Sequence, residues 1–362
     1  MRACDACLRR AWLIGRLADP IERARERSQR LPGILAMPDR DLLGALGGQR
    51  GSSVASEYAG FDPDKAKRRC QAVGVEALCR CDGAYPKRLR DLGDPPAVLF
   101  VAGGVDRFLT LVSDQPVAVV GARRASGYGL EVAAGLGRGI AAAGITVISG
   151  MALGVDSAAH AGALEAKGGT VAVLAAGPER AYPASKRHLH TRIRAEGAVV
   201  SELPPGTTAR RWSFPARNRI IAALAVMTVV VEAGEGSGSL ITASLATEAG
   251  RDVAAVPGRV TSPLSAGTNG LIVDGARPVR DARDVIEGLY GAGTGRAFVA
   301  DAREELPREL RVALDAVSEG DDSVPRLCAR GFAADGALAA FAELELLGYV
   351  RRGAGGRYAV VA

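Results

Sequence analysis

Short apolar runs alternate with helix-like stretches through the middle of the chain. The runs lie at 117–120, 145–149, 170–175, 198–200, 227–232 and 252–256, and small or polar residues bound them. The stretches between the runs have a helical pattern. Apolar strands separated by helices are typical of a parallel sheet that is covered on both faces. We therefore predict an α/β fold with a doubly wound parallel sheet.

The same pattern divides the chain into four parts. Residues 1–80 are predicted to form an N-terminal helical module of the SAM or helix-hairpin type, because LPGI and LLGAL resemble a small module with hairpin turns. Such a module either packs on its neighbours or contacts nucleic-acid backbone through a Gly turn. Residues 81–290 are predicted to form the sheet-bearing core, and 291–303 a linker. Residues 304–362 show helices followed by a β hairpin, which is the order of a winged helix.

Charge is distributed unevenly around a net value of +6. Residues 1–80 carry 15 Lys and Arg against 10 Asp and Glu, residues 116–291 carry 18 against 14, and residues 300–362 carry 8 against 11. A basic N-terminal and central part fits a polyanionic partner or simple solubility. The acidic C-terminal part favours protein docking or a structural role over DNA binding.

Cysteine usage and hydropathy indicate a cytoplasmic protein without a membrane span. There is no apolar run of 18 residues, no signal-peptide core and no disulfide framework. Cys4 and Cys7 form a CxxC pair, and Cys70, Cys79 and Cys81 could complete four zinc ligands, although the spacings are loose. Free thiols are the favoured interpretation, with no metal and no cofactor. The alternative is a zinc site at Cys4, Cys7, Cys79 and Cys81.

The loop GARRASGYG follows a strand and opens a helix. Gly121 would allow a tight turn, Arg123 would reach into the mouth of the sheet, and Ser126 could cap a helix that begins near Gly127. The loop matches neither GxGxxG nor a P-loop, so dinucleotide binding is weakly supported. Anion binding at a helix N-terminus remains open beside an ordinary strand-to-helix turn.

A second loop, SGMALGVDSAAH, carries Ser149 and Gly150 at a strand end. Gly154 would permit a backbone reversal. Asp156 and His160 lie at i and i+4, which would suit an Asp-oriented general base. We favour a structural role for this pair, because no nucleophile is evident.

Three further segments combine cations, aromatics and hydroxyls. GPERAYPASKRHLH places Lys186 and Arg187 at a basic helix start. RRWSFPARNRII sets Arg beside Trp and Phe, which is the composition of a single-strand groove. The alternative is that its Arg and Asn residues brace neighbouring loops, and we expect both roles to be present. In EAGEGSGSLITA, backbone N–H groups and hydroxyls come together at a helix start, as in a phosphate cradle.

The ordered set of motifs resembles the DprA/Smf family of bacterial DNA-processing proteins. It comprises YPKRL, DPPAVLFVAG, VAVVGARRASGYG, SGMALGVDSAAHAGAL, YPASKRHL, FPARNRIIAAL, VVVEAGEGSGSLITASLA and SAGTNGLIVDGA. The resemblance implies an extended Rossmann-like core that binds single-stranded DNA. It also implies a homodimer that protects incoming strands and loads the RecA recombinase during natural transformation and recombination.

The residues expected to bind DNA or phosphate come from these motifs. They are Gly121, Arg123, Arg124, Ser126, Ser149, Gly150, Lys186, Arg187, Phe214, Arg217, Asn218, Arg219, Ser237, Gly238 and Ser239. We expect binding without turnover and no catalytic residue. The alternative is a nucleotide-binding enzyme or sensor of the phosphoribohydrolase-like superfamily, whose PGGxGTxxE loop has no match in register here.

Overall fold

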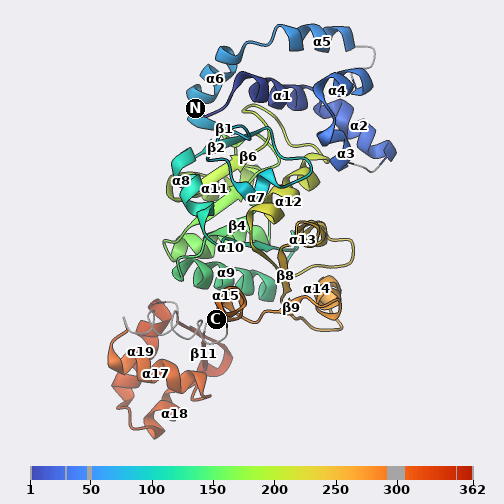
Figure 1. The fold of residues 1–362 in the computed structure, drawn as a ribbon. Coiled ribbons are helices and arrows are strands. Elements are labelled where there is room, and N and C mark those ends of the chain that lie inside the picture. The colour runs from blue at the N-terminus through green and yellow to red at the C-terminus, as the bar shows by residue number, and fades with distance from the viewer. Residues whose placement is uncertain (1, 29–30, 47–50, 292–305, 348, 361–362) are drawn as a thin grey trace. The chain divides into compact units, whose positions relative to one another are not determined.

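The computed structural model describes residues 2–28, 31–46, 51–291, 306–347 and 349–360 (Figure 1). The chain divides into two compact units, Met1–Arg280 and Asp281–Ala362. Each unit has its own apolar core.

The larger unit is built on one nine-stranded sheet with the order β1-β2-β6-β5-β4-β3-β7-β8-β9. The strands are β1 (Val75–Cys79), β2 (Val98–Ala102), β3 (Val117–Val120), β4 (Val147–Ser149), β5 (Thr170–Val173), β6 (Ala198–Ser201), β7 (Met227–Val230), β8 (Asp252–Ala255) and β9 (Arg277–Pro278). Strands β3 to β9 pair in parallel, and β2 pairs antiparallel with both β1 and β6. The six strands expected from the apolar runs are therefore confirmed as β3 to β8.

The order of the strands reverses between β3 and β7. Strands β4, β5 and β6 are added on one side of β3, and β7, β8 and β9 on the other. Ligands of open α/β sheets bind beside such a switch point, outside the carboxyl ends of the strands. We call this the carboxyl edge of the sheet.

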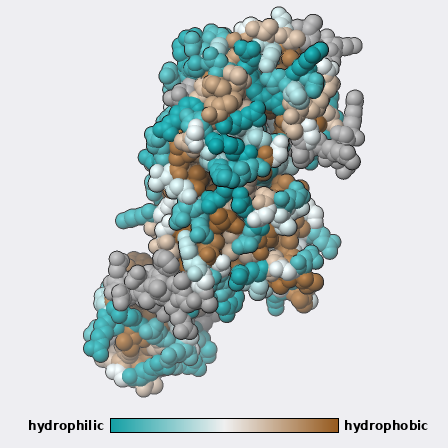
Figure 2. All heavy atoms as spheres, viewed as in Figure 1, coloured by the Kyte–Doolittle hydropathy of each residue, from teal (hydrophilic) through white to brown (hydrophobic). Residues whose placement is uncertain are grey.

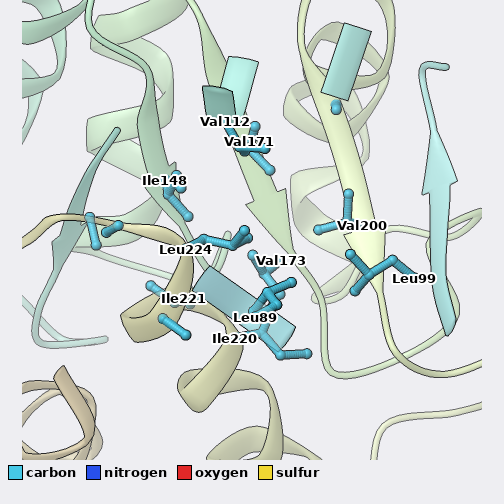
Figure 3. Close-up of a cluster of buried hydrophobic side chains, with 14 of the residues drawn as sticks. Leu89, Leu99, Val112, Ile148, Val171, Val173, Val200, Ile220, Ile221 and Leu224 are labelled. Atoms are coloured by element: carbon cyan, nitrogen blue, oxygen red, sulfur yellow. The ribbon is translucent and has the colours of Figure 1, made fainter. Parts of the chain in front are cut away.

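Helices cover both faces of the sheet. Helices α9 (Gly127–Ala142), α10 (Val155–Glu165) and α11 (Arg187–Glu196) follow β3, β4 and β5, whereas α12 (Ser213–Leu224), α13 (Gly238–Glu248) and α14 (Ala266–Val273) follow β6, β7 and β8. The core under α12 contains Ile220 and Leu224 against Val171 and Val173, together with Leu89 of α7 (Lys87–Arg90) (Figure 3). Helix α8 (Val105–Ser113) packs in the same core.

The opposite face of the sheet has its own core. Leu164 of α10 and Ile193 of α11 pack against Ala172, Val199 and Phe100. Because neighbouring residues of one strand point to opposite faces, this core and the one under α12 use alternate positions of the same strands. The sheet is thus buried on both sides, as predicted.

Six helices lie at the β1–β2 end of the sheet (Figure 1). They are α1 (Asp5–Arg16), α2 (Ala18–Ser28), α3 (Leu31–Ala36), α4 (Asp39–Leu46), α5 (Gly51–Ala59) and α6 (Pro63–Ala72). Trp212, fully buried just before α12, packs into their core, and its indole Nε1 donates a hydrogen bond to the Ala18 carbonyl oxygen (2.9 Å). The helical segment therefore packs firmly on the sheet-bearing core.

The smaller unit contains α15 (Ala282–Tyr290), α17 (Arg308–Ser318), α18 (Val324–Ala329), α19 (Ala334–Leu346) and the hairpin β10 (Val350–Arg352) and β11 (Tyr358–Val360). The rings of Phe341 and Tyr358 stack in its core, with their centroids 4.0 Å apart. The order of α17 to β11 agrees with the predicted winged-helix-like arrangement, with the short helix α18 in addition. Of the predicted linker 291–303, only Gly291 lies within the described residues.

None of the described helices is both long enough and apolar enough to cross a bilayer. Figure 2 shows that the face in view is largely hydrophilic, with apolar residues in small separate groups.

Candidate nucleic-acid interface

The loops that follow β3 and β7 are bonded to one another across the switch point. Ser126 donates hydrogen bonds from its Oγ (2.6 Å) and its backbone N (2.8 Å) to the two carboxylate oxygens of Glu232. The Ala122 N–H donates to the Glu232 carbonyl oxygen (2.7 Å). Ser126 also accepts from the Gly129 N–H (3.1 Å), which confirms it as the N-cap of α9. Ser126 therefore fixes the shape of the edge, and Glu232, absent from the predicted set, is its partner.

Glycines are required where these loops approach each other. A Cβ at Gly121 would lie 2.7 Å from the Val155 side chain and 3.0 Å from the Glu232 carbonyl oxygen. A Cβ at Gly129 would collide with the Glu232 carboxylate. Gly121 thus permits the close turn predicted for it, and it acts through packing.

A row of side chains is formed by Arg123 of the β3 loop, Tyr182 of the segment after β5, and Phe214 in the first turn of α12. The Arg123 guanidinium lies over the Phe214 ring, with Cζ 4.8 Å from the ring centroid. The Phe214 and Tyr182 rings have centroids 5.6 Å apart and planes tilted by 51°. Tyr182 is 46% exposed, and Phe214 is partly buried. We call these three residues the aromatic row; rings and guanidinium planes of this kind are surfaces on which bases stack.

Cations without carboxylate partners lie in the same chain segments as Arg123 and Tyr182 of the aromatic row. Arg123 and Arg124 are exposed in the β3 loop, and Arg187 is exposed at the start of α11. Lys186, partly exposed, ends the short 3₁₀ helix Ala184–Lys186. Within the described residues none of these four forms an ion pair, whereas Arg138 on the far part of α9 pairs with Glu165. Their charges are therefore available to a polyanion.

Arg217 has a different place from the one expected of a phosphate contact. Its side chain is buried, and its Nη1 donates to the carbonyl oxygens of Gly150 and Val173, both at 2.6 Å. Burial lowers the pKa of Arg217 to about 10, although Asp156 opposes the shift. Gly150 is required because any Cβ there would collide with the guanidinium. Arg217 thus ties the ends of β4 and β5 together, which favours the bracing alternative.

Arg219 is also buried and faces away from Arg217. Its Nη2 donates to both carboxylate oxygens of Glu202 (2.6 and 2.7 Å), and its Nη1 donates to the Asp94 carbonyl oxygen (2.7 Å). Burial raises the pKa of both Glu202 and Asp94, while the Arg219 charge opposes these shifts. Both terminal nitrogens donate to protein groups, and the buried Nε lies 3.3 Å from the Asp94 carboxylate without a hydrogen bond, so direct phosphate contact by Arg219 is not supported by the geometry.

The hydroxyl loops are likewise engaged within the protein. Ser149 is buried, and its Oγ donates to the Val119 carbonyl oxygen (2.6 Å). Ser237 is the N-cap of α13, and its Oγ lies 2.8 Å from the Oγ of Ser239, which is also buried. Asn218 donates from Nδ2 to the Gly238 carbonyl oxygen (3.2 Å), which joins α12 to the start of α13. Phosphate binding by Ser237 and Gly238 stays a prediction.

Asp156 and His160 do not form a dyad. The Asp156 carboxylate accepts from the N–H groups of Gly150 (3.2 Å) and Ala152 (3.3 Å), and burial raises its pKa. The His160 Nδ1 lies 2.7 Å from the Thr170 Oγ, and burial lowers the pKa of His160 to about 3. The structural role favoured from the sequence is therefore the one observed.

The four cysteines of the zinc alternative converge in space. The Sγ atoms of Cys4, Cys7, Cys79 and Cys81 all lie within 4.8 Å of one another, at the far end of the sheet from the switch point. Cys70 is buried separately in the apolar core.

Tyr182, like Glu232, is absent from the predicted set of site residues. It lies in the quoted segment YPASK, four residues before Lys186. An exposed aromatic beside a basic helix start was the signal that could have identified it.

Comparisons with known proteins identify the family of the chain. The family model described as DNA recombination-mediator protein A matches residues 76–290. The chain is 37% identical to the putative DNA processing protein DprA of Mycobacterium tuberculosis over 333 residues, which cover 87% of this chain and 82% of that protein. It is 39% identical to the DNA processing protein DprA of Bacillus subtilis over 217 residues, covering 60% of this chain and 72% of that one.

Solved structures of DprA proteins are also similar. DprA of Streptococcus pneumoniae superposes with a TM-score of 0.62 at 32% identity, covering 79% of this chain and 98% of that chain. DprA of Helicobacter pylori superposes with a TM-score of 0.53 at 29% identity, covering 59% of this chain and 95% of that chain. That structure was solved to explain a single-stranded DNA binding mode. With a family model over more than half of its length and a relative matched along most of both chains, this protein belongs to the DprA/Smf family of DNA-processing proteins.

Proposed function

We propose that this protein binds single-stranded DNA along the carboxyl edge of the sheet. The observation that carries the proposal is the aromatic row of Arg123, Phe214 and Tyr182, flanked by cations that have no carboxylate partner. Cations that follow a backbone, combined with ring faces on which bases stack, are the elements of sequence-tolerant single-strand binding. The single-stranded DNA binding of the Helicobacter pylori relative supports the same function here.

The proposal gives the named residues two kinds of role. Arg123, Arg124, Lys186 and Arg187 contact phosphates, and the rings of the aromatic row contact bases. The residues behind them hold the loops in place, through Ser126 at the switch point and Arg217 at the ends of β4 and β5. Phosphate and ring contacts carry little sequence information, so binding is expected to be largely independent of sequence.

We extend the proposal to the cellular role implied by the family. The protein, acting as a homodimer without turnover, protects incoming single strands and loads the RecA recombinase on them in natural transformation or recombination. The family description as a recombination mediator supports this role. It is tested by whether the protein accelerates RecA assembly on single strands already covered by a single-strand-binding protein, and by whether its mass in solution is that of two chains.

The binding proposal is tested by fluorescence anisotropy with labelled oligonucleotides of increasing length, single- and double-stranded, at two salt concentrations. We expect tighter binding to longer single strands and weakening with salt, by about 0.7 log units in affinity per log unit of salt for each phosphate contact. Arg123→Ala should bind more weakly, whereas the matched control Arg138→Ala, far from the carboxyl edge, should bind like wild type.

Two results would contradict the proposal. One is equal affinity for single and double strands with no effect of Arg123→Ala. The other is saturable binding or hydrolysis of a mononucleotide with poor binding of every oligonucleotide, which would support the enzyme or sensor alternative.

A further inference from the structure

Four thiols meet where the first helix joins the outermost strand of the sheet. Cys4 is the N-cap of α1, and Cys7 lies in its first turn. Cys79 is the last residue of β1, and Cys81 follows two residues later. Their Sγ atoms all lie within 4.8 Å of one another, and the Cys7 and Cys81 sulfurs are 3.6 Å apart. No other cluster of three or more metal-ligating side chains occurs among the described residues.

The spacing of these sulfurs fits one tetrahedral ion. Four thiolates at a zinc–sulfur distance of about 2.3 Å have sulfurs about 3.8 Å apart. The Cys7–Cys81 separation of 3.6 Å is close to this value and no pair exceeds 4.8 Å, so small rotations of the side chains would bring all four onto one centre. A disulfide would need two sulfurs at about 2.05 Å, and all six cysteines are free thiols.

The backbone holds the two halves of the cluster in register. The Arg2 N–H donates to the Ala77 carbonyl oxygen (2.7 Å), and the Cys79 N–H donates to the Arg2 carbonyl oxygen (2.9 Å). The Cys4 N–H donates to the Cys79 sulfur (3.4 Å). Such N–H donors stabilise metal-bound thiolates and orient them. The positive end of the α1 dipole lies at the same place and also favours negative sulfur.

Two thiols of the cluster are buried and two are exposed, which suits a structural metal that can enter from solvent. Cys7 and Cys79 are buried, whereas Cys4 and Cys81 are exposed. Four soft sulfur ligands leave no open position for water or substrate, which is the donor set of a structural zinc site. The exposed cation Arg80, between the two C-terminal ligands, lies next to the negative charge that a tetrathiolate centre carries.

We propose that Cys4, Cys7, Cys79 and Cys81 bind one structural Zn²⁺ ion. The ion joins ligands 75 residues apart in sequence and so fastens α1 to the edge strand β1. The site lies at the edge strand β1, whereas Arg123 of the aromatic row follows the central strand β3, and the site is independent of the proposed DNA binding.

The experiment measures metal in the full chain, purified under reducing conditions without added metal or chelator. Elemental analysis should find about one zinc per chain. Cys4→Ser and Cys81→Ser change the two exposed ligands, which disturbs the core least, and each should lose most of the zinc. The control Cys328→Ser changes a thiol of the other unit and should retain it.

Cobalt provides a readout that does not depend on how the variants fold. Wild-type protein stripped of metal and given Co²⁺ should develop the intense visible and near-ultraviolet bands of tetrahedral cobalt thiolate, and Zn²⁺ should displace them. Removing the zinc should also lower the thermal unfolding midpoint of wild type. Wild-type protein that contains no zinc and takes up no Co²⁺ would overturn the proposal, as would stoichiometric iron in place of zinc, or zinc retained by both Cys4→Ser and Cys81→Ser.

Discussion

Phe214 and Arg123 touch each other, yet they should affect DNA binding in different ways. Phe214 offers a ring face, and replacing it with Leu keeps an apolar side chain of similar bulk between Arg123 and Tyr182. Stacking of one base on an aromatic side chain contributes about 1–3 kcal/mol. Phe214→Leu should therefore weaken single-strand binding by roughly 5- to 150-fold at every salt concentration, without changing the salt dependence.

Arg123→Ala should instead change the salt dependence. Loss of one phosphate contact reduces the slope of log affinity against log salt by about 0.7. Loss of the exposed cation–π contact with Phe214 should also lower the free energy of unfolding by about 0.5–1 kcal/mol. The double variant should lose less single-strand binding free energy than the two single variants lose together. The reason is that Phe214 positions the Arg123 guanidinium, whose Cζ lies 4.8 Å from the centroid of its ring.

The assay is an anisotropy titration of the four proteins at four salt concentrations, with thermal unfolding as a check on folding. The reasoning is refuted if Phe214→Leu binds within twofold of wild type while remaining folded. It is refuted equally if Arg123→Ala leaves the salt slope unchanged.

Three further predictions concern the parts behind and beyond the interface. Arg217→Ala leaves the buried carbonyls of Gly150 and Val173 without their donor. Because each unsatisfied group costs about 1–3 kcal/mol, the free energy of unfolding should fall by at least about 2 kcal/mol. Chemical denaturation measures this loss, and an unchanged midpoint would contradict the bracing role. His160, with its pKa lowered to about 3, stays neutral in the folded protein, whereas the unfolded chain takes up a proton below about 6.5. Its contribution to stability is therefore full above pH 6.5 and falls by about 1.4 kcal/mol per pH unit between 6.5 and 3; His160→Gln should flatten that part of the stability–pH curve, and parallel curves would exclude the effect. A chain ended after Gly291 should keep its single-strand affinity within about twofold, because the part removed is net acidic; a tenfold loss in the same titration would assign DNA contacts to the C-terminal unit.

Strands β3 to β8 could be predicted because each of them carries a local signal. The apolar runs at 117–120 and 227–232 need only their own residues to be recognised, and Ser126 precedes a helix as an N-cap does. Ser126 was therefore assigned its capping role correctly, whereas its bond to Glu232 joins residues 106 apart and has no local signal.

The division of the RNR motif required the structure. Residues two apart on a helix point about 200° apart, so Arg217 and Arg219 could not both face one groove. The sequence does not say which of them meets Gly150 and which meets Glu202, because both partners come from other loops. The same limit applies to the cysteines, since looseness of spacing in the sequence says nothing about the distance between two thiols in the fold.

The bond between Ser126 and Glu232 has a consequence for changing what this protein binds. The two loops at the switch point are held by protein groups, so their conformation does not depend on a ligand to order it. The exposed side chain of Arg123 projects from the β3 loop without contributing to that bonding. Ligand preference should thus be open to redesign at the projecting positions with little loss of folding stability, as in binding loops carried on a rigid scaffold.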